Sequence, residues 1–253
     1  MTQICRIALL PIWLFAATLS AAESPPSAPA VPAVPAVKCF EFNDPETMKN
    51  SWVCGGKQFG VPMTGFSIVS CPSARDGKAL AVSARGSSGV LVTQVPESVW
   101  RNFPVLRWRW RVLKKISFSG KEPDDQAAVI YFGDGTMLSK FMVGYRWEHS
   151  CPLGDESQLT YIGGTMVRRI CMRNAEAVPG QWYVEERNVI DDFKRAFGRP
   201  PKGNCGLTIG GNSQYSGSDT LVQIDYIEFR PAAKKPERSP ENEEKTKKGG
   251  KGE

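Results

Sequence analysis

One eight-residue stretch, Val105–Val112, limits the possible fold more than any other part of this sequence. Apolar side chains, including Trp108 and Trp110, alternate along it with arginines. Successive side chains of a β-strand point to opposite faces, so this pattern is typical of a strand with one buried face. We therefore expect both tryptophans in the core. The residues predicted on the opposite face are Arg107, Arg109 and Arg111.

The same period of two recurs along most of the chain between residues 38 and 232. Ala127–Phe132 is predicted to be a strand, Gly133–Gly135 a turn that permits positive φ, and Lys140–Glu148 its hairpin partner. Further strands are predicted at Phe66–Cys71, Lys78–Ser83, Val90–Val95, Met166–Met172, Gln181–Arg187, Leu207–Gly210 and Leu221–Phe229.

A single helix is predicted, at residues 189–198. Apolar residues recur there with helical spacing, Asn188 is a suitable N-cap, and Gly198 is a suitable C-terminal stop. About ten short strands with one helix predict an all-β fold, a β-sandwich of jelly-roll type. Gly (24) and Pro (19) fit such a turn-rich architecture.

The two ends of the chain differ in composition from the middle. Residues 1–22 combine a basic start, a short apolar run and Ala21-Ala22, which predicts a cleaved signal peptide; an uncleaved N-terminal anchor is the alternative. Residues 23–37 form a Pro/Ala-rich linker, residues 38–232 a β-sandwich domain, and residues 233–253 a disordered charged tail. We expect a periplasmic or secreted protein with no transmembrane segment in the mature chain.

Removal of the signal peptide leaves six cysteines, an even number. In an exported chain this favours disulfide bonds, although some of the six could be buried thiols instead. The preferred pair is Cys151–Cys171, because these residues flank one loop between neighbouring strands. The other four are Cys39, Cys54, Cys71 and Cys205.

Several segments together resemble a known bacterial family. The most specific are Pro104–Val112 (PVLRWRWRV), Glu186–Val189 (ERNV) and the strand Asp225–Phe229. On these motifs the chain resembles the exported family catalogued as "domain of unknown function 3047", over roughly Phe40–Arg230. The resemblance implies an exported β-sandwich with no established activity.

The chain departs from that family at residues 212–216. Members usually carry an acidic motif there, whereas Asn212 and Gln214 are amides, which argues against a cation site built on those carboxylates. The two ends of the domain also resemble a carbohydrate-binding module, in which carboxylates of the first and last strands often hold Ca²⁺. Glu41 and Asp225 are the candidate ligands here, but calcium takes six to eight oxygen ligands and these two could be ordinary strand carboxylates.

The arginine row has two interpretations. Three like charges at a spacing of two repel each other unless carboxylates on neighbouring strands answer them, and Glu148, Glu185 and Asp225 could do so. The row would then be a salt-bridged sheet surface. Alternatively it lines a cationic groove for acidic sugars, because Arg binds carboxylates well.

Other ligand-binding candidates are aromatic or acidic. Aromatic side chains on loops or polar faces can stack on sugars, whereas adjacent carboxylates in a rigid loop can bind a cation or sugar hydroxyls, or only an arginine. The candidates are Tyr145, Trp147, Trp182, Asp124, Asp125 and Arg187.

Composition and motif content argue against several classes of function. The chain has one His and a net charge of +6, and it contains no P-loop, dinucleotide-binding, HExxH or GxSxG motif. Its basic residues are not clustered as nucleic-acid binding requires. No catalytic residue is assigned, and apart from the calcium possibility no cofactor is expected. We favour a non-catalytic binding module, most readily for carbohydrate; the alternatives are an envelope structural or interaction protein, or a polysaccharide lyase or hydrolase.

Overall fold

The computed structural model describes residues 38–56, 58–119, 124–135, 140–161 and 164–233. The predicted signal peptide and the C-terminal tail from residue 234 lie outside these residues, as does the predicted linker. Within the described part, none of the helices has the length and apolar character needed to cross a membrane.

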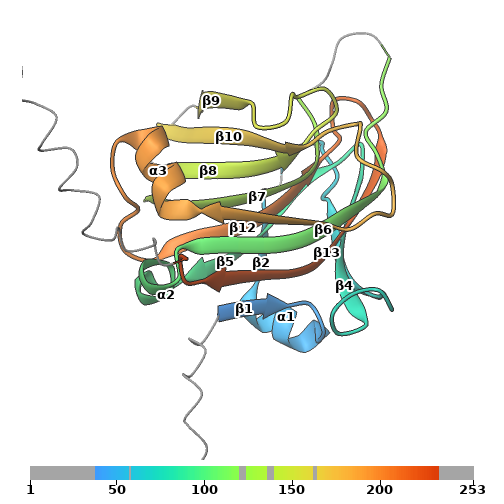
Figure 1. Ribbon diagram of the computed structural model, residues 1–253. Helices are drawn as coiled ribbons and strands as arrows, with labels where there is room; N and C mark the ends of the chain where they lie inside the picture. Colours follow the sequence, from blue (N-terminus) through green and yellow to red (C-terminus); the bar gives the residue numbers. More distant parts are fainter. Residues whose placement is uncertain (1–37, 57, 120–123, 136–139, 162–163, 234–253) are drawn as a thin grey trace, which may run out of the picture. The chain divides into compact units, whose positions relative to one another are not determined.

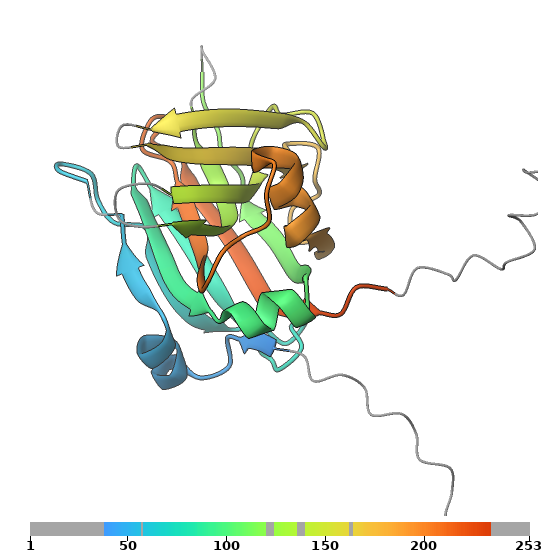
Figure 2. The ribbon, with the colours of Figure 1, turned by 90° about the vertical axis from the view of Figure 1, so that its left-hand side faces the viewer.

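Two β-sheets form the fold, and Figures 1 and 2 show them as two layers. The first has six strands in the order β11-β6-β13-β4-β3, and β1 pairs with β13 beside β4. β13 is its hub, because it pairs with three other strands. The bounds are β1 Lys38–Glu41, β3 Gly65–Ser70, β4 Lys78–Arg85, β6 Val105–Lys114, β11 Tyr183–Asn188 and β13 Asp219–Arg230.

The second sheet has seven strands in the order β2-β5-β12-β7-β8-β10-β9. All its neighbours are antiparallel except β8 and β10, which run parallel. The bounds are β2 Val53–Gly55, β5 Ser88–Val95, β7 Gln126–Gly135, β8 Lys140–Trp147, β9 Glu156–Tyr161, β10 Thr165–Arg173 and β12 Cys205–Asn212.

The core between the sheets is rich in large aromatic side chains. Trp108 and Trp110 of β6 are fully buried, as the alternation of this strand predicts. They meet Tyr145 and Trp147 of β8, with ring centroids 5.0 Å apart for Trp108–Tyr145 and 5.2 Å for Trp110–Trp147. These offset and edge-on contacts are favourable arrangements for aromatic rings. These ring contacts join β6 of the first sheet to β8 of the second.

In the part of the chain that the structure describes, three short helices accompany the sheets: α1 (Pro45–Ser51), α2 (Glu97–Asn102) and α3 (Val189–Phe197). The helix predicted at 189–198 is α3, and its ends follow the expected chemistry. The Asn188 side chain accepts hydrogen bonds from the Ile190 and Asp191 amides, and Gly198 is left-handed with φ of 69°. The sequence pattern misses α1 because that helix buries none of its residues, so it has no apolar stripe.

The fold class predicted from the sequence, a β-sandwich of jelly-roll type, is confirmed. One predicted turn is wrong. Strand β7 continues through Gly133–Gly135, where buried Asp134 accepts hydrogen bonds from both terminal nitrogens of Arg199 at 2.6 and 2.9 Å. This ion pair anchors the segment after α3 to the end of β7.

The disulfide between Cys151 and Cys171 is confirmed, and it closes a loop with a sequence separation of 20. Disulfide bonds among the other four cysteines are not found, and the alternative interpretation, that some of the six are thiols, describes them. Cys39, Cys54, Cys71 and Cys205 are free thiols, and Cys71 and Cys205 are buried. Burial raises the pKa of the Cys39 and Cys205 thiols to about 12, so both stay protonated at neutral pH.

Candidate functional site

A groove crosses the outer face of the seven-stranded sheet and is the best candidate site. It consists of two hollows, of about 390 and 190 Å³, which share Val90 of β5 and Tyr131 of β7. The first hollow reaches Gly206 and Thr208 of β12, and the second reaches Asn212 and the loop after it. We call these two hollows together the groove.

Tyr131 lies at the centre of the groove because its neighbour on β8 is a glycine. The two residues are partners in the β7–β8 register. A Cβ atom at Gly144 would come within 2.5 Å of Tyr131 Cε1, so the ring lies directly over the glycine. Burial raises the pKa of the Tyr131 hydroxyl, which therefore keeps its proton over the physiological range. The result is a fixed aromatic surface with a polar tip.

The second hollow gathers polar and aromatic side chains around Tyr131. Tyr161 and Tyr215 also line it and are about half and two thirds exposed. Three amide side chains line it as well. Asn212 donates to the Asp124 carbonyl and accepts from the Gln214 backbone amide, and Gln126 donates to Asp124 and Glu148. Gln214 adds an amide group that can donate and accept hydrogen bonds at the same time. This combination of tyrosines and amides suits a ligand that has both apolar faces and hydroxyl groups.

Asp124 and Asp125 have different roles at this hollow. The Asp124 side chain is 58% exposed and accepts a hydrogen bond at 2.6 Å from Arg169, which is buried in the sheet. Buried Asp125 accepts from the backbone amides of Tyr215 and Ser216, at 3.3 and 2.7 Å. Asp125 therefore positions the loop that carries Tyr215, while Asp124 faces the hollow.

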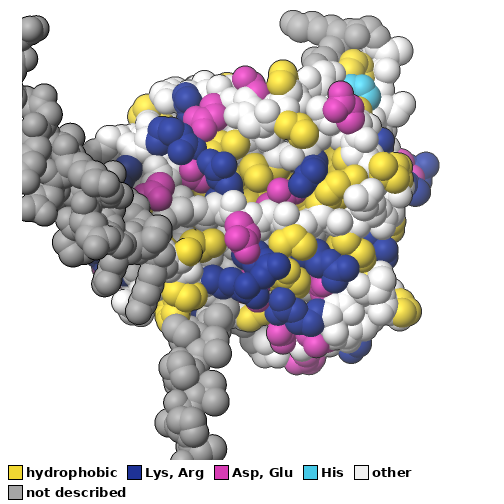
Figure 3. Space-filling model, viewed as in Figure 1, with side chains coloured by type: hydrophobic (Ala, Val, Ile, Leu, Met, Phe, Trp, Pro, Cys, Tyr) yellow, Lys and Arg dark blue, Asp and Glu magenta, His cyan; other side chains and the backbone are white. Residues whose placement is uncertain are grey.

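The arginine row lies on the outer face of the other sheet. Figure 3 shows basic side chains gathered in a band over β6 and β13, with acidic ones beside them. Arg109 pairs with Asp225 at 2.8 Å, whereas Arg111 donates to Gln223 at 2.6 Å. Arg107 approaches Glu186 at 3.2 Å and Glu228 at 3.9 Å. The salt-bridged interpretation describes this surface, and the guanidinium groups are engaged rather than free.

Of the partners expected for the row, only Asp225 is correct. Glu148 pairs with Arg146 and Arg169 on the opposite sheet, and Glu185 pairs with Arg173 at 2.6 Å. β11 turns Glu185 toward the core side and Glu186 toward the arginines, because neighbouring residues of a strand face opposite ways.

Trp182 caps the arginine row. Its ring lies 4.6 Å from the Arg109 guanidinium and 4.5 Å from that of Arg111, and its indole N–H donates to Ser73. Such cation–π contacts stabilise the surface and occupy one face of the ring. Arg187 is likewise engaged, in two hydrogen bonds to buried Asp192 at 2.6 and 2.9 Å. Neither residue lines the groove.

Tyr145 and Trp147 are not exposed platforms, contrary to the prediction. Both are buried to 1% exposure or less, and the Tyr145 hydroxyl donates to Asp192 at 2.9 Å. The physical reason is strand phase: Gly144 and Arg146 occupy the outward positions of β8, so the aromatic residues between them point inward.

The predicted calcium ligands do not form a cation site. Glu41 and Asp225 lie on neighbouring strands, but Asp225 is occupied by the Arg109 side chain and by the Arg75 backbone amide at 2.8 Å. Glu41 is 3.8 Å from the Arg75 guanidinium. Among the residues that the structure describes, no group of three or more His, Cys, Asp or Glu could hold a metal.

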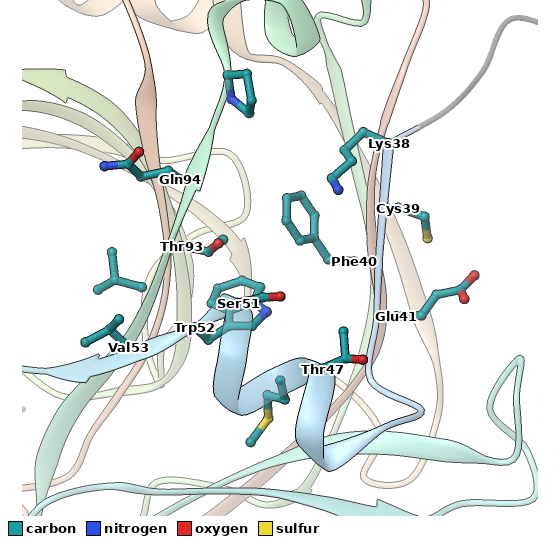
Figure 4. A pocket seen from close by; sticks show the side chains of 13 residues that line it. Lys38, Cys39, Phe40, Glu41, Thr47, Ser51, Trp52, Val53, Thr93 and Gln94 are labelled. Carbon is teal, nitrogen blue, oxygen red and sulfur yellow. The ribbon is translucent and has the colours of Figure 1, made fainter.

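A larger hollow, of about 650 Å³, lies between β1, α1 and β5. Figure 4 shows Lys38 and Phe40 pointing toward it, while Cys39 and Glu41 point away. Phe40 and Trp52 form its aromatic floor, with ring centroids 5.6 Å apart. Its lining includes the polar residues Lys38, Thr47, Ser51, Thr93 and Gln94. Its Trp52 ring is buried, however, whereas the groove exposes the rings of Tyr161 and Tyr215, so the groove is the better candidate for stacking on a ligand.

Comparison with known proteins agrees with the resemblance noted from the sequence. The model of the family described as "Protein of unknown function (DUF3047)" matches residues 57–228, about two thirds of the chain. A search of the curated proteins finds no match.

Among solved structures, the chain is similar to the family 11 carbohydrate-binding module of cellulase Lic26A-Cel5E from Clostridium thermocellum (12% identity, 74% of this chain and 91% of that chain covered, TM-score 0.40). It is also similar to carbohydrate esterase vb_24B_21 of bacteriophage phi24B (16% identity, 77% of this chain and 100% of that chain covered, TM-score 0.40). A third similar structure is endoglucanase 3 of Trichoderma harzianum (9% identity, 70% of this chain and 89% of that chain covered, TM-score 0.40). The TM-scores are too low for these similarities to carry a functional argument.

Proposed function

The chain belongs to the family "Protein of unknown function (DUF3047)", and from that premise we propose that it is an exported, non-catalytic module that binds glycans in the groove of its seven-stranded sheet. The observation that carries the proposal is the packing of the Tyr131 ring over Gly144, in a groove that is also lined by Tyr161 and Tyr215. A sugar ring presents C–H faces that pack on aromatic rings, and its hydroxyls take hydrogen bonds from amides and carboxylates.

The carboxylates of the groove argue for binding rather than hydrolysis. Of the described residues that line it, the carboxylates are Asp124 and Asp134, at opposite ends of β7. Their separation along the strand is roughly 30 Å, far beyond the distance of about 10 Å within which two carboxylates flank one glycosidic bond. Asp134 is also held by Arg199. Paired-carboxylate catalysis therefore has no support in this groove.

Two features support a compartment outside the cytoplasm. Residues 1–22 have the composition of a secretory signal. The Cys151–Cys171 disulfide fits an oxidising compartment outside the cytoplasm. We place the module in the periplasm or outside the cell.

A glycan array probed with the mature chain tests the proposal, followed by titration calorimetry on each glycan that binds. Tyr215→Ala should weaken binding by about 1–3 kcal/mol, since an exposed aromatic platform carries much of such an interface. Its melting temperature should stay unchanged because Tyr215 is 65% exposed. The matched control is Trp182→Ala, which removes an aromatic ring from the opposite sheet and should leave affinity intact.

Two results would contradict the proposal. A blank array together with recovery of a protein partner from envelope extract would favour an interaction protein. Release of reducing ends from a bound polysaccharide would show an enzyme.

A further inference from the structure

We propose that the groove takes an extended, uncharged polysaccharide chain that lies along β12. This inference rests on the proposed function and adds the class of glycan and its direction. Three features of the groove carry it: both hollows lie along one strand, the space above Gly206 is open, and the charged groups are paired or lie at the rim.

The two hollows follow one strand. The first is lined by Asn204, Cys205, Gly206 and Thr208 and the second by Gly210–Asn212, so both lie along β12. From Gly206 to Asn212 the strand advances by roughly 20 Å. A single sugar would fill only part of that length, whereas a chain of several sugars would occupy both hollows.

Small residues recur at outward positions of β12, and the first hollow is open above one of them. Gly206, Thr208 and Gly210 face outward, since Leu207 and Ile209 between them are buried in the core. A Cβ atom at Gly206 would have its nearest neighbour 3.9 Å away, so the space above this residue is open. At Gly210 a Cβ atom would instead lie 3.0 Å from Val129 Cγ1 and 3.4 Å from Val90 Cγ1, so these two valines form an apolar floor between the hollows. A flat chain that passes from one hollow to the other would lie across them.

The charged groups of the groove are already paired or at its rim. Asp134 is bound by Arg199, and Asp124 by Arg169. Arg169 also lies 3.7 Å from Glu148. Lys140 is exposed at the edge of the first hollow, where solvent screens its charge. An acidic sugar would thus be repelled by the half-exposed Asp124 carboxylate, and no unpaired buried cation among the described residues of the groove would offset that repulsion. The hydroxyl groups of an uncharged sugar can form hydrogen bonds with the tyrosine and amide side chains of the groove.

The test is calorimetry of the mature chain with two sets of probes. One set is cello-, manno- and xylo-oligosaccharides from disaccharide to hexasaccharide, and the other is oligogalacturonates of the same lengths. At least one neutral series should bind, with the hexasaccharide at least tenfold tighter than its disaccharide. The oligogalacturonates should bind at least tenfold more weakly than that series.

Gly206→Val provides the structural arm of the test. The new side chain fills open space at one hollow and leaves the Tyr131–Tyr215 hollow intact. It should bring hexasaccharide affinity down to that of the disaccharide and leave disaccharide affinity unchanged. Val184→Ala, an exposed change on β11 of the other sheet, is the control and should alter neither.

The outcomes separate this inference from the proposed function. Tighter binding of oligogalacturonates would overturn the uncharged class, and equal affinity at all lengths would overturn the extended chain along β12. Either result leaves glycan binding standing. Failure of every glycan on the array, acidic and neutral, would overturn the proposed function itself.

Discussion

Replacing Arg109 by alanine should destabilise the domain without changing glycan binding. The Arg109 guanidinium pairs with Asp225 at 2.8 Å, and the Asp225 side chain is only 1% exposed. Truncation would leave that carboxylate without its cation, and breaking a buried ion pair in this way typically costs 3–5 kcal/mol.

The expected magnitude lies near the lower end of that range. The Arg109 side chain is 26% exposed, so water can reach part of the vacated space, and the Arg75 backbone amide still donates to Asp225. Loss of the stacking contact with Trp182 adds about 0.5–1 kcal/mol. A total of about 3.5–4 kcal/mol corresponds to a fall in melting temperature of roughly 7–16 °C for a domain of this size.

Thermal unfolding followed by circular dichroism measures the effect, with two companion variants. Lys114→Ala removes a cation from the same strand, but the Lys114–Asp219 pair is more than half exposed on both sides. It should cost under about 1 kcal/mol. The double variant Arg109→Ala with Asp225→Asn should be less destabilised than the two single changes added together, since the stranded charge is gone. An Arg109→Ala protein that melts like the wild type but no longer binds glycan would refute this reasoning and return the ligand site to the arginine row.

Three further predictions concern other parts of the domain. Reduction of the disulfide should destabilise the folded protein by about 3 kcal/mol, in the chain-entropy model for a loop of this length, and melting with and without reductant measures it. Iodoacetamide at pH 8 should modify exposed Cys54 first. Cys39 and Cys205, whose thiol pKa is about 12, should react only as the pH rises toward that value, and peptide mass mapping distinguishes the three; rapid labelling of Cys205 would contradict its burial. Gly144→Ala should weaken glycan binding as much as Tyr131→Ala does, because the new methyl group displaces the Tyr131 ring. Combining the two changes should cause no further loss of affinity. Additive losses in calorimetry would contradict the packing of the Tyr131 ring over Gly144.

The parts of this fold that follow from the sequence are those with a strong local period. In β6 the alternation of arginine with apolar residues determines which side chains are buried. α3 is equally local, since Asn188 and Gly198 mark its two ends. The same alternation rule, applied to β8, places Tyr145 and Trp147 inside, in phase with Val143.

The candidate site could be predicted only in part, because its geometry depends on strand pairing. Asp124 was a candidate from its loop context, and it faces the groove. Tyr131 gave no signal of its own, because its place on the groove depends on Gly144 lying opposite it in the β7–β8 register. The Arg109–Asp225 pair likewise depends on β6 lying beside β13. Residues far apart in the chain meet at both places, and sequence periodicity carries no information about such contacts.

The position of β13 as hub of the six-stranded sheet has a consequence for the order of folding. Its partners include β1 at the other end of the described chain, with Cys39 opposite Glu228, and two further strands that flank it. A growing chain that ends before residue 219 has no middle strand for this sheet, so its sandwich cannot close while synthesis continues. Pairing across such long sequence separations also slows folding, because distant segments must meet before either gains stability. The six-stranded sheet of the nascent protein therefore stays incomplete until β13 has been synthesised.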